Sequence, residues 1–187
     1  MRKLEEFVNE KLKVSKGSTP EYTLFPKTRE ELIEMIREKI KAEGPDCDLN
    51  CIDVSNITNF GAVFGSWGTK LFNGNISKWD MSNAISLNSM FNGSMFSGID
   101  GGIADWDVSN VEMMDYTFNS SKFNSDISNW NVEKVRSMVC TFQDSDFEQD
   151  INSWNPKSIE HHGFSHTFDY CPLKAQKKLP KWYKALL

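Results

Sequence analysis

The chain has 187 residues, of which 39% are hydrophobic and 25% charged, and its formal net charge at pH 7 is −5. These values are typical of one compact domain or one capped repeat array, and they argue against overall disorder. The acidic balance argues against nucleic-acid binding as the main role. With 13 Phe and six Trp, aromatic side chains are expected to fill the core.

The charge is distributed unevenly along the chain. Residues 1–45 carry 10 Lys/Arg and 9 Asp/Glu, residues 46–170 carry 6 and 17, and residues 171–187 carry 5 and none, which gives net charges of +1, −11 and +5. The middle part therefore favours a partner with a basic surface, or a cation, over a phosphate backbone. An acidic surface that is simply solvated is the alternative interpretation.

The first residues are charged, and no apolar stretch follows them, so the sequence predicts neither a secretory signal nor a membrane span. The four cysteines, Cys47, Cys51, Cys140 and Cys171, are expected to be reduced thiols, and no metal site is predicted for them. These features favour a cytoplasmic protein, unless a signal has been removed.

Residues 1–45 are interpreted as an N-terminal helical cap. A first helix is expected over residues 3–13. A second begins at Thr28, where Thr28 and Glu31 form a capping box. An apolar stripe follows, and Gly44 and Pro45 end this second helix.

A tandem repeat of 24 residues occupies the middle of the chain. Trp recurs with an Ile three residues before it and an Asp or Asn directly after it. Each unit continues with an aliphatic residue and with two apolar residues four positions apart, of which the second is always Phe. The recurring Trp and Phe are Trp79, Trp106, Trp130 and Trp154, and Phe91, Phe118, Phe142 and Phe168.

Two local patterns alternate within each unit. Asp126–Trp130 mixes apolar and polar residues over a short span, which predicts a brief strand. Val135–Phe142 has apolar residues at spacings of three and four, which predicts about two helical turns. The fold class expected is therefore an α/β repeat protein, a leucine-rich-repeat-like solenoid with about five 24-residue units.

The repeats alone cannot bury their apolar side, so stacking should place equivalent Trp and Phe side chains in ladders along the axis. Residues 46–173 form the expected solenoid and residues 174–187 the expected C-terminal cap. A basic amphipathic helix for a membrane or a partner is the alternative for this last segment.

The repeat resembles that of BspA-like proteins, a family named from bacterial surface proteins and mycoplasma lipoproteins. The stretch Phe123–Val132 is similar to the family motif F-N-x-D-I-S-x-W-D-V, and Asp107–Met114 to its continuation D-V-S-N-V-x-x-M. The resemblance covers about residues 26–173, because the lead-in to the array is similar as well. It implies a leucine-rich-repeat-like solenoid used for adhesion or protein–protein contact, without an enzymatic core.

Candidate binding residues are those that vary while the repeat frame is kept. We expect one continuous partner-binding strip near the Ile-to-Trp segments, made of the following residues: Lys78, Asp105, Asp126, Asn129, Asp150 and Ser153. The Asx residue after each Trp is expected to cap its own turn, although a cation site is the alternative.

The three histidines, His161, His162 and His166, are expected to be packing or incidental residues, and no metal or cofactor is predicted. No catalytic constellation interrupts the repeat, so no enzyme is predicted and no catalytic residue is assigned. The expected function is binding of a protein partner, as an intracellular bacterial or phage-borne adaptor or inhibitor. An acidic nucleic-acid mimic is one alternative, and a surface adhesin whose signal peptide was removed is another.

Overall fold

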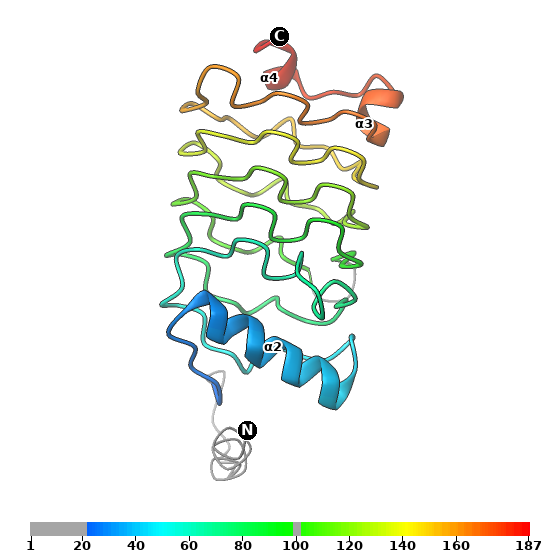
Figure 1. Ribbon diagram of the computed structural model, residues 1–187. Helices are drawn as coiled ribbons and strands as arrows, with labels where there is room; N and C mark the ends of the chain where they lie inside the picture. The colour runs from blue at the N-terminus through cyan, green and yellow to red at the C-terminus, as the bar shows by residue number, and fades with distance from the viewer. Residues whose placement is uncertain (1–21, 99–101) are drawn as a thin grey trace.

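The computed structural model describes residues 22–98 and 102–187; the helix expected over residues 3–13 lies outside them. Within these ranges the helices are α2 (Arg29–Glu43), α3 (Pro172–Ala175) and α4 (Lys181–Lys184). Between α2 and α3 the chain winds in coils that lie on top of one another, with α2 at one end of the stack and α3 and α4 at the other (Figure 1). None of the helices in these ranges is long and apolar enough to cross a membrane.

Helix α2 covers the first coil. The Thr28 hydroxyl accepts a hydrogen bond from the Glu31 N–H, and the Glu31 carboxylate accepts one from the Lys27 N–H, so Thr28 is the N-cap that the sequence predicted. Gly44, at φ 92°, ends the helix. The stripe of α2 buries Leu32 and Ile36 completely against the coils.

The coils pair in parallel through their backbones. We number them 1 to 5 by the residues that occupy one equivalent position, namely Asn59, Ser86, Met113, Ser137 and Gly163. Successive members of the first four are joined by parallel β-bridges. In coil 4 every second N–H donates to the next coil at 2.6–3.0 Å, from Met138, Cys140, Phe142 and Asp144 to the carbonyls of Gly163, Ser165, Thr167 and Asp169. Of the N–H groups between them, those of Thr141 and Gln143 bond three residues back along the same coil at 3.2 Å. The N–H of Val139 donates at 2.8 Å to Asp115 Oδ1 of the preceding coil. Pairing between coils and turns within coils thus alternate along the backbone.

Two local predictions are wrong. The segment Asp126–Trp130 is not a strand, because the chain turns at Ser128 and Asn129. The segment Val135–Phe142 is not a helix: it makes a β-bridge at Ser137 and then a run of turns. Cys140 has φ 55°, a left-handed conformation that interrupts a right-handed helix. Successive turns of three to four residues nevertheless place Met138 and Phe142 on the same, buried side of the coil. The apolar residues therefore have the spacing of a helix although the segment is not helical.

Aromatic columns fill the interior. Trp79, Trp106, Trp130 and Trp154 stack in one column, with neighbouring ring centroids 6.3 Å apart and ring planes within 7° of parallel. A second column, 5.2–5.5 Å between centroids, contains Phe64, Phe91, Phe118, Phe142 and Phe168. A third, 6.0–6.1 Å between centroids, contains Phe72, Phe96, Phe123 and Phe147. The structure therefore places all eight ladder residues named from the sequence in two of these columns.

Each indole N–H of the Trp column also has an acceptor. Trp130 and Trp154 donate at 2.9 Å to the carbonyls of Ile103 and Ile127, which lie one coil earlier, and Trp79 and Trp106 do the same at 3.0 and 3.2 Å. A buried indole is stabilised only when its polar N–H is satisfied. The Ile that precedes each Trp in the repeat thus supplies core volume with its side chain and an acceptor with its carbonyl.

Candidate functional site

One corner of the stack carries most of the predicted binding residues. We call the segments 75–80, 102–107, 126–131 and 150–155 the acidic corner. Asp126 and Asp150 each accept a hydrogen bond at 2.8 Å through Oδ1 from the N–H two residues later. These Asx turns hold one carboxylate oxygen of each residue in place.

A depression of about 420 Å³ lies in the acidic corner between coils 4 and 5. It is lined by Asp126, Ser128, Asn129, Gln149, Asp150, Asn152 and Ser153. The structure therefore brings together four of the six predicted binding residues. Lys78 and Asp105 take the positions of Asn129 and Ser153 on earlier coils; they are exposed and do not line the depression.

Ion pairs between adjacent coils neutralise part of the charge on the other faces. Lys122 pairs with Asp146 at 3.1 Å, Lys157 with Glu133 at 2.7 Å, and Arg136 with both Glu112 and Glu160. Within residues 22–98 and 102–187, no ion pair involves the five carboxylates of the corner, Asp80, Asp105, Asp107, Asp126 and Asp150.

Hydrogen bonds keep two of these carboxylates ionised. The Ser128 backbone N–H lowers the pKa of Asp126, and the hydroxyl of Ser109, together with its N–H, lowers the pKa of Asp107. Hydrogen bonds to the charged form favour that form. The corner thus presents five carboxylates without an ion pair in the described residues, together with the exposed Lys78, and these carboxylates can accept hydrogen bonds from cationic groups.

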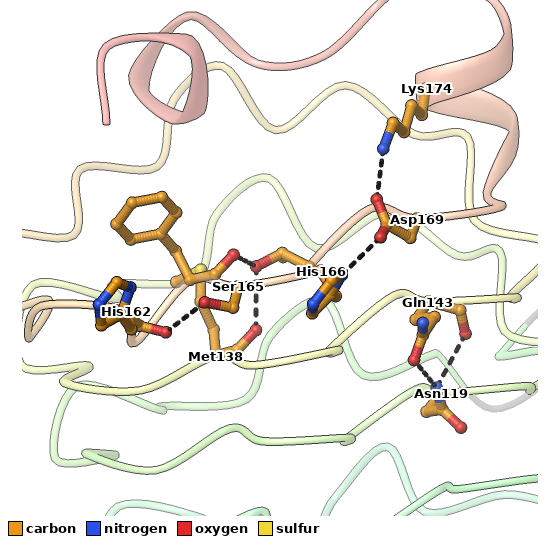
Figure 2. Close-up of polar contacts among 10 residues, drawn as sticks. Asn119, Met138, Gln143, His162, Ser165, His166, Asp169 and Lys174 are labelled. Atoms are coloured by element: carbon orange, nitrogen blue, oxygen red, sulfur yellow. Dashed lines mark hydrogen bonds and ion pairs between the residues drawn. The ribbon is translucent and has the colours of Figure 1, made fainter. Parts of the chain in front are cut away.

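A second polar cluster lies at the C-terminal end of the stack. Asp169 accepts from Lys174 of α3 through one oxygen and lies 2.7 Å from His166 Nδ1 through the other (Figure 2). Lys174 and His166 lower the pKa of Asp169, and the Asp169 carboxylate raises that of Lys174. Across the described residues, no three His, Cys, Asp or Glu side chains are placed to hold a metal ion. Of the three histidines, His166 takes part in the ion-pair network, through Asp169, and His161 and His162 are in ring contact with each other.

The thiol of Cys140 precedes His166 by one coil at the equivalent position. Burial raises the pKa of Cys140, so its thiol stays protonated near neutral pH and is a poor nucleophile. Cys140 and His166 share a left-handed backbone, with φ 55° and 59°. Cys140 and His166 therefore share a position whose left-handed backbone forms part of the turn in each coil.

The match to a family covers most of the chain. A family model described as "Mycoplasma protein of unknown function, DUF285" matches residues 31–98 and, adjacently, residues 93–182. The chain belongs to this family. No curated protein and no solved structure matches it. The DUF285 match includes most of α2, all five coils, the acidic corner and the network around Asp169.

Sequence reasoning missed one polar column inside this DUF285 chain. Thr117, Thr141 and Thr167 are fully buried, and each hydroxyl lies 2.6–3.1 Å from two carbonyl oxygens, one of its own coil and one of the preceding coil. Coils 1 and 2 have Val63 and Met90 at this position. The Thr were a recoverable signal, since they recur at repeat spacing directly before the Phe of the second column.

Proposed function

We propose that this DUF285 protein is a non-enzymatic, leucine-rich-repeat-like solenoid of the BspA-like type that binds a protein partner through the acidic corner. The observation that carries the proposal is the row of five carboxylates without ion pairs among the described residues, beside a depression lined by Asp126, Asn129, Asp150 and Ser153. On the other faces, ion pairs between coils neutralise Glu112, Glu133, Asp146 and Glu160, whereas none of the five corner carboxylates has such a pair within the described residues.

The solenoid part of the proposal is supported by the repeated columns. Equivalent residues lie over one another through five coils, and every Trp of the column bonds to the coil before it. In such a stack the frame residues are used for packing and the variable positions are left for recognition.

The partner has a basic surface. Lys or Arg side chains that enter the depression would meet the carboxylates of Asp126 and Asp150 and the amides of Asn129 and Gln149. Charge complementarity of this kind steers association and selects partners more than it adds affinity. A role as an intracellular bacterial or phage-borne adaptor or inhibitor fits a chain that acts by covering a partner's basic surface.

The test is a charge-reversal pair with a matched control. Asp126→Lys combined with Asp150→Lys should weaken binding to a partner recovered from the native host by about tenfold or more. The reason is that two carboxylates are replaced by ammonium groups, which repel the basic surface of the partner. Glu38→Lys combined with Glu148→Lys makes the same change in net charge outside the corner and should leave affinity within about threefold. Equal affinity of both double variants and the wild type rejects the acidic corner as the binding surface.

The charge of residues 46–170, a net of −11, favours one second candidate, a mimic of nucleic acid that occupies a basic channel. A mimic needs charge spread along its length, so its affinity should fall steeply between low and high salt. The confined acidic corner predicts a shallower dependence. Titration of the partner at several salt concentrations distinguishes the two.

A further inference from the structure

Coil 5 carries a row of backbone donors that have no acceptors among the described residues. In coils 2, 3 and 4, four alternate N–H groups donate to the carbonyls of the following coil. The equivalent groups of coil 5 belong to Phe164, His166, Phe168 and Tyr170. Across residues 22–98 and 102–187, none of these four N–H groups has a hydrogen-bond acceptor. We call these four groups the donor row.

Residues 172–187 supply only half of a sixth coil over the donor row. Leu179 and Trp182 repeat the Ile-to-Trp spacing, and Trp182 donates at 2.9 Å to the Ile151 carbonyl as the earlier Trp residues do to theirs. Lys181 N–H also bonds to Asn152 Oδ1 across the coils. Trp182 already lies in α4, which takes the place of the second half of a coil, so residues 181–187 supply no carbonyl acceptor to the donor row.

Helix α4 covers the core beneath the donor row without satisfying it. The Tyr183 ring meets the rings of Phe168 and Phe164 edge-on, with centroids 4.8 and 6.0 Å apart. Phe168 has 0% of its surface exposed, so its N–H lacks a water partner as well. A buried backbone N–H without a partner is costly. Tyr183 is therefore an incomplete substitute for a sixth coil.

The polarity of the donor row excludes a second copy of this chain as its occupant. A two-fold dimer through this edge would place donors against donors. The opposite end of the stack, which presents coil 1 carbonyls, is covered by α2, whose Arg29 donates to the Gly61 carbonyl at 3.1 Å. What fits is an extended backbone that presents carbonyls at every second residue.

The surroundings of the donor row add positive charge. Residues 171–187 carry five Lys and no acid, and of these only Lys174 has an ion pair within the described part of the chain. Beside the row, Tyr170 is 83% exposed and lines a depression of about 770 Å³ together with Lys174 and three carboxylates, those of Asp144, Asp146 and Asp169. Two of these carboxylates are paired, Asp146 with Lys122 and Asp169 with Lys174. We infer that the donor row is a docking edge for an extended, acidic segment of a partner protein, which pairs in parallel register where a sixth coil would lie.

The experiment uses the full chain and a defined probe, a synthetic peptide of residues 112–121 with both ends blocked. In coil 3 the carbonyls of Met113, Asp115, Thr117 and Asn119 accept the four N–H groups of coil 2, so this peptide carries the matching acceptors and two acidic side chains. At saturation, amide exchange at Phe164, His166, Phe168 and Tyr170 should slow by about tenfold or more in NMR spectra of the labelled protein.

Variants keep the test decisive. Tyr183→Ala removes the ring that the peptide has to displace and should tighten peptide binding by about threefold or more. The same peptide with Glu112→Lys and Asp115→Lys should bind at least about threefold more weakly at low salt. Unchanged exchange of the four amides in the wild type, or peptide shifts confined to the acidic corner, overturns the docking edge. Equal binding of the lysine peptide overturns the acidic character of its occupant.

Discussion

Trp182 of α4 stacks on Trp154 of the last coil, with ring centroids 6.2 Å apart. Its indole N–H reaches the Ile151 carbonyl, which is the bond that every other Trp of the column makes one coil earlier. The C-terminal segment therefore closes the stack with the repeat's own anchor instead of an unrelated cap. This relationship explains why the array ends in a short helix without exposing the Trp column.

Removal of this closing ring should destabilise the whole stack. Trp182→Ala is expected to lower the free energy of unfolding by about 2–4 kcal/mol, because it opens a void over Trp154 and removes one of the two hydrogen bonds to the Ile151 carbonyl, the other coming from the Trp154 N–H. Trp67→Ala is the matched control: Trp67 is 92% exposed, so its loss should change stability by less than about 0.5 kcal/mol. Urea unfolding of both variants measures the difference, and equal losses would contradict the stacking role.

The buried threonine column should contribute through its hydroxyls. Thr141→Val keeps the volume but removes the contacts of Oγ1 with the Met114 and Met138 carbonyls, and should cost about 1 kcal/mol. Thr58→Val, at an exposed position, should be neutral within about 0.5 kcal/mol. A Thr141 variant as stable as the wild type would show that the two carbonyls are satisfied without the hydroxyl.

The left-handed positions should respond to glycine in opposite directions. Gly93 and Ser120 occupy equivalent positions on adjacent coils, with φ 64° and 52°. Ser120→Gly relieves the conformational penalty of a side chain at this φ and should raise stability by about 0.5 kcal/mol, whereas Gly93→Ala should lower it by about 1 kcal/mol. Thermal unfolding of the two variants tests the pair, and a shift of the same sign in both would contradict this backbone assignment.

The network around Asp169 should make the end of the stack sensitive to acid. Lys174 and His166 lower the pKa of Asp169 in the folded chain, so this carboxylate stabilises the fold above its unfolded pKa of about 3.9, and the contribution is lost as the pH falls through the lower folded pKa. Asp169→Asn should therefore be less stable than the wild type at pH 6, and the gap should close in acid. A gap independent of pH would assign the loss to packing.

The repeat could be recognised from the sequence because large side chains recur in it at regular spacing. Trp at 24-residue spacing, each with an Ile three residues earlier, indicated which side chains lie over one another, and the structure places them so. The local backbone was not readable, because turns with a left-handed residue such as Cys140 place Met138 and Phe142 on one side as a helix would. Spacing alone does not separate these two conformations.

The candidate site was readable in part. Asp126, Asn129, Asp150 and Ser153 line one depression because they fall at the same turn of adjacent coils, which repeat alignment indicated. The sequence alone did not indicate which acidic side chains form ion pairs and which do not. It depends on which charged residue of the next coil lies opposite, as Lys122 does to Asp146, and this register appears only in three dimensions.

A crystal structure of the full chain tests the central claim most directly. The account predicts one column of five indoles, Trp79, Trp106, Trp130, Trp154 and Trp182, with neighbouring centroids 6.2–6.3 Å apart and each Nε1–H bonded to a carbonyl of the preceding coil. A map in which any of the five lies outside the column, or turns its N–H to solvent, would contradict it.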